Sequence, residues 1–210
     1  MPGHTRALLR SVARFTLRGL PAGPHVTRYA MYRELKAFAG VLRKDGRTLS
    51  VSHSKPLCDT LGVAPHRVVE ANFPECDLLA LPFADGEFAN VITDQVLEHV
   101  KGDPKVAIDE SVRVLSPGGV AVHTTCFINP VHDAPADYWR FTPEALRLLC
   151  KDHEVLGAGG WGNKLVWVVD ALGLRFDPVP HAKWHPLHKV ATLDDPDWPV
   201  VTWVVIRKPS

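Results

Sequence analysis

The chain has 210 residues, of which 46% are hydrophobic and 22% are charged, a composition typical of a soluble globular protein with a hydrophobic core. No apolar run reaches the ~20 residues of a membrane-spanning helix, and the apolar content excludes a chain that is mainly disordered. The four cysteines include no C-x-x-C pair. We therefore expect neither a disulfide framework nor a thiolate zinc site, and we expect a cytoplasmic location.

The net charge of +1 hides an uneven distribution along the chain. Residues 1–47 contain ten Lys or Arg and two acidic residues, whereas the remainder contains fourteen and twenty-one. Arginines at every fourth position predict a helix with one basic stripe: Arg6, Arg10, Arg14 and Arg18. Residues 1–44 are thus interpreted as a basic helical extension. Three interpretations of its first twenty residues are open. They dock on an anionic membrane, they form a targeting peptide, or they pack on the chain's own domain.

Further along, segments typical of strands and of helices alternate. The expected strands are 48–51, 68–70, 88–93, 120–126 and 200–206, and the expected helices are 26–39, one that Asp103 caps, and 142–150. The glycine-rich segment 157–163 is expected to be a loop. This alternation predicts one α/β domain over residues 45–210, with a doubly wound, mostly parallel sheet and helices on both faces.

In such a sheet, ligands bind beyond the carboxyl ends of the strands. This rule selects the residues that follow each expected strand as candidates for a binding site. They are residues 52–56, Glu70, Asp77, Leu78, Asp94, Gln95 and the segment after Cys126.

Four of these segments resemble a known family when read in order. Residues 77–88 contain a D-x-x-x-LPF-x-D-x-x-F pattern, residues 97–100 read LEHV, residues 113–119 read RVLSPGG, and residues 132–142 follow H-x-x-P-x-DYWRFT. Together they resemble class I S-adenosylmethionine-dependent methyltransferases of the type 11 group. The resemblance covers residues 48–150 and implies a Rossmann-like fold with seven strands, the last of them antiparallel near one edge.

The resemblance implies roles for individual residues in binding S-adenosylmethionine. Asp77 accepts a hydrogen bond from the adenine amino group, and Leu78 makes an apolar contact beside the ring. Glu70 binds the ribose hydroxyls. Asp94 and Gln95 lie beside the methionine part and face the acceptor.

The cofactor loop departs from the family pattern. An acidic residue and a glycine-rich turn usually follow the first strand, but this chain has Ser50-Val51-Ser52-His53-Ser54-Lys55-Pro56. Glycine suits such a turn because it takes positive φ at no cost. Either Ser52 and Ser54 bind the cofactor with their hydroxyl groups, assisted by Lys55, or the site is degenerate.

Methyl transfer to a hydroxyl group benefits from a general base. The candidates beyond the fifth strand of the family fold are His132, Asp133 and Asp137, of which His132 is preferred, and His123 is less favoured because it lies within the strand. His132 alternatively holds its loop by hydrogen bonds. Glu98 and His99 are interpreted as structural. His181, His185 and His188 have i, i+4, i+7 spacing, but Pro186 interrupts a helix there, so no metal site is predicted.

The resulting hypothesis is a methyltransferase that methylates an oxygen or nitrogen atom of a small-molecule, glycan or lipid-linked acceptor. The alternative is a catalytically inactive pseudo-methyltransferase that acts as a binding or scaffolding module. RNA modification is a third class, supported by the arginine stripe but opposed by the acidic remainder of the chain, so a nucleic-acid partner is not expected.

Overall fold

The computed structural model describes residues 11, 14–132 and 136–209, and they group into two compact units. Of the described residues, 11, 14–33 and 161–200 form one unit, and 34–132, 136–160 and 201–209 form the other. Residues 14–33 are thus grouped with a later part of the chain, while the division at residue 44 drawn from the sequence stays a prediction. Arg6 and Arg10 of the expected basic stripe and the candidate base Asp133 lie outside the described residues.

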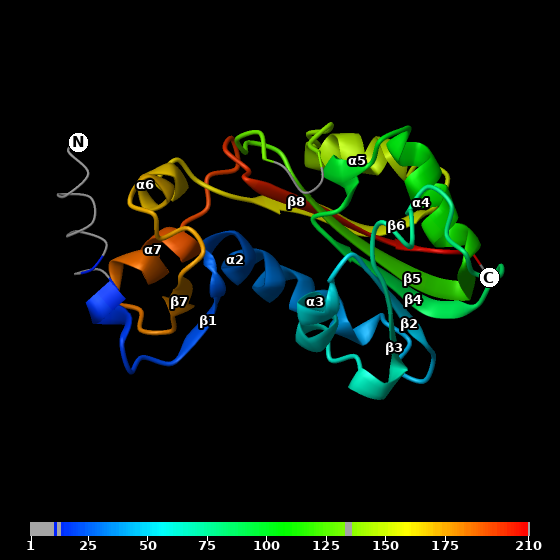
Figure 1. Cartoon of the computed structure of the whole chain (residues 1–210), viewed down its shortest axis with the longest axis horizontal. Coiled ribbons are helices and arrows are strands. Elements are labelled where there is room, and N and C mark those ends of the chain that lie inside the picture. The colour runs from blue at the N-terminus through cyan, green and yellow to red at the C-terminus, as the bar shows by residue number, and fades with distance from the viewer. Residues whose placement is uncertain (1–10, 12–13, 133–135, 210) are drawn as a thin grey trace. The chain divides into compact units, whose positions relative to one another are not determined.

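The larger unit is built on a sheet with the order β3-β2-β4-β5-β8-β6 (Figure 1). Its strands are β2 (Thr48–Val51), β3 (Val68–Ala71), β4 (Phe88–Asp94), β5 (Leu115–Cys126), β6 (Glu154–Trp161) and β8 (Val201–Arg207). The pairs β2–β3, β2–β4 and β4–β5 are parallel, whereas β8 runs antiparallel to β5. The predicted Rossmann-like α/β class and the antiparallel last strand next to an edge are therefore confirmed.

The described residues form six strands in this sheet rather than the seven that the family resemblance implied. The segment between β3 and β4 contributes only an isolated bridge between Asp77 and Ala80. This segment contains two prolines, Pro74 and Pro82, and proline cannot donate to a ladder. The strand that would follow β3 is replaced by a loop.

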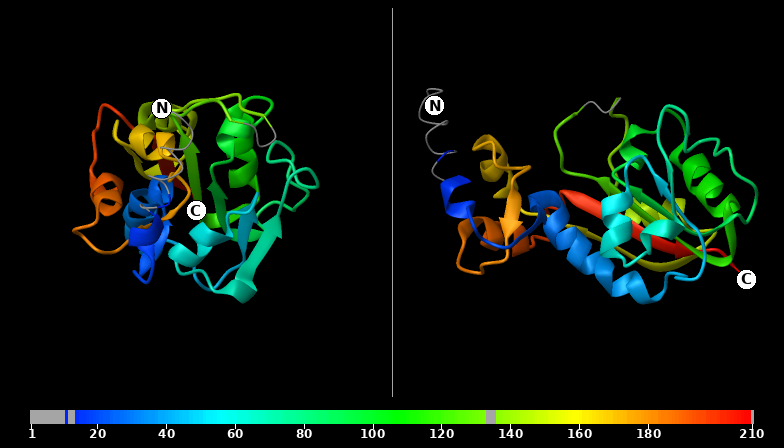
Figure 2. Two further views of the ribbon diagram at one scale, coloured as in Figure 1. Left: turned by 60° about the vertical axis from the view of Figure 1, so that its left-hand side comes forward. Right: turned by 60° about the horizontal axis from the view of Figure 1, so that its bottom comes forward.

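Helices cover both faces of the sheet, as Figures 1 and 2 show: α4 and α5 lie on one side and α3 on the other. Their bounds are α3 (Lys55–Thr60), α4 (Pro104–Arg113) and α5 (Pro143–Leu149). Leu49 and Val51 of β2 join a hydrophobic cluster with Ile108 of α4, while the alternate residues Thr48 and Ser50 are buried on the opposite face. This two-residue period is that of a strand covered on both sides.

Local capping signals place two of these helices. The Asp103 carboxylate accepts a hydrogen bond from the Lys105 N–H (2.8 Å), and the Thr142 hydroxyl accepts one from the Ala145 N–H (3.0 Å). Proline occupies the first position of each helix, where its missing N–H costs nothing. Both helices begin where the sequence predicted.

The glycine-rich segment 157–163 was predicted to be a loop, and this prediction is wrong for most of its length. Residues up to Trp161 belong to β6, which pairs with β8. A Cβ atom at Gly157 would lie 2.5 Å from Phe38 Cζ, and one at Gly159 would lie 2.8 Å from Trp203 Cζ2. These glycines therefore serve close packing of aromatic rings and not chain flexibility.

The smaller unit contains the strand pair β1 (Ala22–His25) and β7 (Pro178–Pro180), which is antiparallel. It also contains α6 (Val166–Ala171), α7 (Pro186–Thr192) and most of α2 (Val26–Leu35), which continues into η1 (Lys36–Gly40). The Arg14 guanidinium pairs with the Asp177 carboxylate at 2.9 Å. No helix among the described residues is long and apolar enough to cross a membrane.

The three histidines with regular spacing lie in this unit, where Tyr29 contacts both His181 and His188. His185 caps α7 by accepting a hydrogen bond from the Leu187 N–H (3.1 Å). His181 Nδ1 lies 3.0 Å from the Tyr29 hydroxyl oxygen, and His188 Nδ1 lies 2.9 Å from the Pro180 carbonyl oxygen.

Candidate cofactor-binding site

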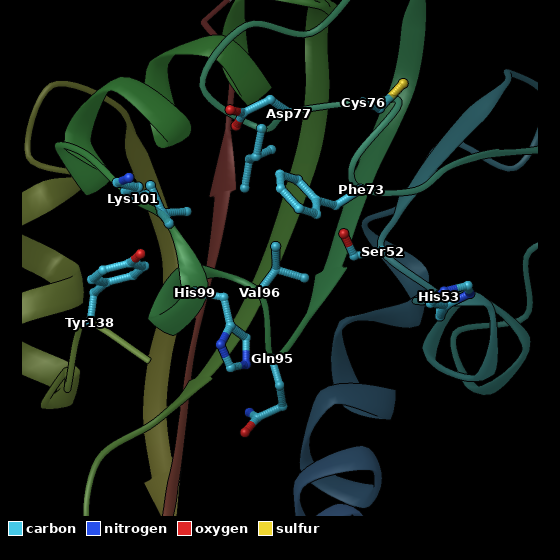
Figure 3. Close-up of a pocket in the computed structure, with 12 residues that line it drawn as sticks. Ser52, His53, Phe73, Cys76, Asp77, Gln95, Val96, His99, Lys101 and Tyr138 are labelled. Carbon is cyan, nitrogen blue, oxygen red and sulfur yellow. The ribbon is translucent and has the colours of Figure 1, made fainter. Parts of the chain in front are cut away.

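A cavity of about 490 Å³ opens at the carboxyl ends of β2 and β4 (Figure 3). Its walls come from four segments far apart in the sequence: Ser52 and His53 after β2; Phe73, Cys76, Asp77 and Leu78 after β3; Gln95, Val96, His99, Val100 and Lys101 after β4; and Tyr138. A cavity of this volume holds a ligand of nucleoside size. It lies where the strand-end rule predicted.

The loop after β2 takes the backbone path of a glycine-rich turn without glycine. Ser52 has φ 53° and His53 has φ 63°, which is the left-handed region. Each such residue costs about 1 kcal/mol or more. The Ser52 N–H donates to the Ala71 carbonyl (2.9 Å), and the His53 N–H donates to Asn72 Oδ1 (2.9 Å). Contacts with the end of β3 thus hold the loop in this shape.

Ser54 does not reach the cavity. It is fully buried, its hydroxyl donates to the Val51 carbonyl, and it accepts the Asp94 N–H at 2.7 Å. The Asp94 carboxylate in turn accepts the Thr124 hydroxyl proton at 2.7 Å. Of the residues predicted to bind the cofactor, Ser54 and Asp94 therefore fasten the ends of β2, β4 and β5 to one another beneath the cavity.

Asp77 and Leu78 both line the cavity, as the resemblance implied. Asp77 Oδ1 accepts the Leu79 N–H (2.9 Å), and the Asp77 carbonyl oxygen accepts the Ala80 N–H (3.0 Å). This compact turn fixes the carboxylate at the cavity wall. Leu78 is 4% exposed and belongs to the main hydrophobic cluster, so it presents an apolar surface that the core holds in place.

Gln95 (φ 59°) is, with Ser52 and His53, one of the described non-glycine residues that have positive φ, and it also lines the cavity. Its backbone N–H donates to Thr124 Oγ1 (3.0 Å), and its side-chain Nε2 donates to the Thr125 carbonyl oxygen (2.7 Å). The strained turn at the end of β4 is thus fastened to β5. This arrangement places the Gln95 carboxamide on the wall between the two strands.

Glu70, predicted to bind the ribose, is not among the residues that line the cavity. Its carboxylate is 42% exposed and lies 4.0 Å from the Lys55 ammonium group. Asn72, two residues later, reaches the cofactor loop through His53 instead. β3 extends to Ala71, so the first residue beyond the strand is Asn72, which is likewise not among the residues that line the cavity.

His132 and Asp137 lie together, and Asp137 organises the pair. Its side chain is 1% exposed and accepts hydrogen bonds from the Arg140 guanidinium and from the His132 N–H (2.9 Å). Arg140 first, and then the His132 N–H, lower the pKa of Asp137 to about 2. A carboxylate with so low a pKa is a weak base near neutral pH. Asp137 therefore orients its neighbours, and its Oδ2 lies 3.1 Å from His132 Nδ1.

His99 connects these residues to the cavity. It lines the cavity wall, and its Nδ1 atom lies 2.6 Å from the Ala136 carbonyl oxygen. Its ring meets the His132 ring edge to face, with centroids 4.9 Å apart. The sequence analysis interpreted His99 as structural, and no local pattern signals that the segment around His132 folds back onto it.

Comparisons with known proteins agree with this architecture. Residues 33–123 match the family model described as a methyltransferase domain. No curated protein matches the sequence. Among solved structures, the [4+2]-cyclase SpnF (18% identity, TM-score 0.53) aligns over 86% of this chain and 80% of its own. A second structure is a sarcosine dimethylglycine methyltransferase from Galdieria sulphuraria, described as putative. It shares 15% identity with a TM-score of 0.54, and the alignment covers 87% of this chain and 85% of that one.

A third similar structure is an N-methyltransferase of Haemonchus contortus in complex with phosphomonomethylethanolamine and S-adenosylhomocysteine. It shares 13% identity with a TM-score of 0.53, and the alignment covers 86% of this chain and 53% of that one. At such identities the likenesses show the fold. The similar structures include a cyclase and methyltransferases by name, so the fold alone does not decide which reaction a protein catalyses.

The sheet order and the strand-end cavity agree with the Rossmann-like fold of these similar structures. The resemblance to S-adenosylmethionine-dependent methyltransferases that the sequence motifs indicated is confirmed, with residues 33–123 as the matching methyltransferase domain.

Proposed function

We propose that the chain binds S-adenosylmethionine in the strand-end cavity and transfers its methyl group to an oxygen or nitrogen atom of a small-molecule, glycan or lipid-linked acceptor. The observation that carries the proposal is the shape of the loop after β2. Ser52 and His53 hold the left-handed conformation that glycine usually supplies. Backbone strain of this kind is concentrated at ligand-binding and active sites, so it supports a binding role for this loop.

The cavity walls fit the parts of this cofactor. Phe73 and Leu78 offer apolar contacts for the adenine ring, and the Asp77 carboxylate is an acceptor for its amino group. Asn72, fixed at the end of β3, is the polar residue we assign to the ribose side in addition to the predicted Glu70. Ser52 and Gln95 lie toward the methionine part, and Ser54 and Asp94 support the floor.

The cofactor supplies a methyl group on a positively charged sulfur, and the C–S bond breaks with its electron pair kept by sulfur as the acceptor bonds to carbon. The protein's contribution is therefore position and exclusion of water. Tyr138 and His99 line the cavity on the side of the segment around His132. We assign this polar side to the acceptor, whose own proton leaves for a nearby acceptor group or solvent.

Calorimetric titration with S-adenosylhomocysteine tests the proposal. We expect measurable binding by the intact chain and an affinity at least tenfold lower for Asp77→Asn, which keeps an oxygen for the Leu79 N–H but loses the charge. Asp59→Asn, an exposed change in α3, is the matched control and leaves the affinity unchanged. No heat from the folded wild-type protein at millimolar ligand would overturn the proposal and favour the non-catalytic binding module.

A further inference from the structure

We propose that Glu98, His99 and His132 form a binding site for one divalent transition-metal ion. One ligand atom from each of the three side chains lies within 4.8 Å of the others. Tetrahedral ligation at about 2.0–2.2 Å requires ligand atoms about 3.3 Å apart. Modest side-chain rotation therefore closes the site around an ion.

The fold brings these residues together from two distant segments. Glu98 and His99 belong to η3 (Leu97–His99), which directly follows β4, and His132 lies in the segment that follows β5. The backbone carbonyl of Glu98 accepts the N–H groups of Tyr138 (2.8 Å) and Trp139 (3.2 Å). This pair of hydrogen bonds ties the second segment to the first and holds His132 near its partners.

Both histidines have Nδ1 beside an oxygen acceptor. His99 Nδ1 is 2.6 Å from the Ala136 carbonyl, and His132 Nδ1 is 3.1 Å from Asp137 Oδ2. With the proton on Nδ1, both oxygen contacts become hydrogen bonds and Nε2 is the lone-pair nitrogen that can bind a metal ion. A ligand histidine that donates its other N–H to a carbonyl or carboxylate is the usual arrangement at metal sites, because it fixes the tautomer and the ring orientation.

Glu98 supplies a charged oxygen from the protein interior. The residue is fully buried, and its Oε2 accepts the Thr125 hydroxyl proton at 2.8 Å. The Arg140 guanidinium contributes positive charge nearby but forms a two-bond pair with Asp137. A buried carboxylate is stable only when opposite charge and hydrogen bonds compensate its lost hydration, and a bound cation contributes to both.

The ligand set indicates the class of ion. Two imidazole nitrogens and one carboxylate oxygen suit Zn²⁺, Co²⁺, Fe²⁺ or Mn²⁺, whereas Mg²⁺ and Ca²⁺ prefer oxygen ligands. Three protein ligands leave a coordination position open. Since His99 also lines the cavity, an acceptor hydroxyl bound at that position would lose its proton more readily. This role rests on the proposed function, and it makes His132 a ligand instead of the base.

Metal binding itself is measured without cofactor. The intact chain, stripped with a chelator, is titrated with Zn²⁺ by calorimetry and with Co²⁺ by visible absorption in a non-coordinating buffer. We expect one ion per chain, and at least tenfold weaker binding for His132→Ala, His99→Ala and Glu98→Gln. His188→Ala and Cys76→Ser control for the other histidine cluster and for the thiol in the cavity, and they keep wild-type affinity.

Circular dichroism and S-adenosylhomocysteine titration of the same samples separate the two proposals. Loss of the metal with cofactor binding intact in His132→Ala supports the site, and His132→Gln repeats the test if the alanine variant fails to fold. Absence of stoichiometric binding to the wild type, or equal loss in the His188 control, overturns the metal site without touching the methyltransferase proposal.

Discussion

The hydroxyl group of Ser54 accepts a hydrogen bond of 2.7 Å from the backbone N–H of Asp94, and it donates its own proton to the Val51 carbonyl oxygen. The two strands β2 and β4 are therefore joined at their carboxyl ends through one buried side chain. This link lies beneath the residues that line the cavity, so it supports the site without contacting a ligand there.

Replacing this hydroxyl should destabilise the domain. In Ser54→Ala the Asp94 N–H loses its acceptor, and we expect the free energy of unfolding to fall by about 1–3 kcal/mol. Thr60→Ala removes a hydroxyl that bonds to the Pro56 carbonyl within α3 at the surface, and we expect a fall below about 0.5 kcal/mol. Urea unfolding of both variants provides the comparison, and equal losses would contradict the role of Ser54.

A second prediction concerns the left-handed loop. His53→Gly removes the cost of positive φ, about 1–2 kcal/mol, which offsets the entropy lost by glycine. His66 is exposed and sits in a right-handed 3-10 helix, η2 (Pro65–Arg67), so His66→Gly should lower the free energy of unfolding by about 0.5–1 kcal/mol. We expect His53→Gly to be the more stable of the two by about 1 kcal/mol or more in thermal or urea unfolding, and the reverse order would count against strain at position 53.

The Asp137 carboxylate should make the folded state sensitive to acid. Its pKa is lowered to about 2, chiefly by Arg140, so its stabilisation is complete above its ordinary pKa near 3.8 and is lost as the pH falls toward 2. This loss amounts to about 2 kcal/mol. Unfolding free energies from pH 5 to pH 2 should therefore converge for wild type and Asp137→Asn. Asp59→Asn, which removes an exposed carboxylate of α3, serves as the control for the loss of one negative charge.

His123 should make the free energy of unfolding depend on pH over a higher range than Asp137 does. Burial, assisted by the charge of His153, lowers the pKa of His123 to about 4, below the ordinary value of 6.5. The unfolded chain takes up the proton first, so stability falls as the pH drops from 6.5 to 4, by up to about 3 kcal/mol. His123→Asn keeps an acceptor for the Thr93 hydroxyl, which lies 2.9 Å from His123 Nδ1, and should flatten this dependence. The exposed His66→Asn serves as the control for the loss of one imidazole group.

Much of the fold could be read from local patterns. The segments 48–51, 68–70 and 88–93 are apolar, short and bounded by turn residues, and they form β2, β3 and β4 within one residue of the expected bounds. Asp103 and Thr142 cap their helices because capping depends on a few neighbouring residues. Asp77 and Leu78 were expected at the cavity because they begin the recognisable motif of residues 77–88.

Other features depend on contacts between distant residues. The segment 157–161 is a strand because β8 provides a hydrogen-bonding partner and because rings of Phe38 and Trp203 need space where a Cβ would be. Ser54 turns inward because the N–H of Asp94, forty positions away, requires an acceptor. No composition or spacing at these positions distinguishes them from a flexible loop or a ligand contact.

The sequence alone thus predicted strands β2 to β5 and β8, the caps of α4 and α5 and the edge of the sheet where the cavity opens. These features follow from hydrophobic period and local hydrogen bonding. Only the tertiary structure showed that Ser52 and His53 take the left-handed conformation usual for glycine. It also showed that the side chains of Glu98, His99 and His132 lie close together. Both outcomes depend on backbone and side-chain contacts with residues such as Asn72, Ala136 and Asp137, whose distances are set only once the sheet has assembled.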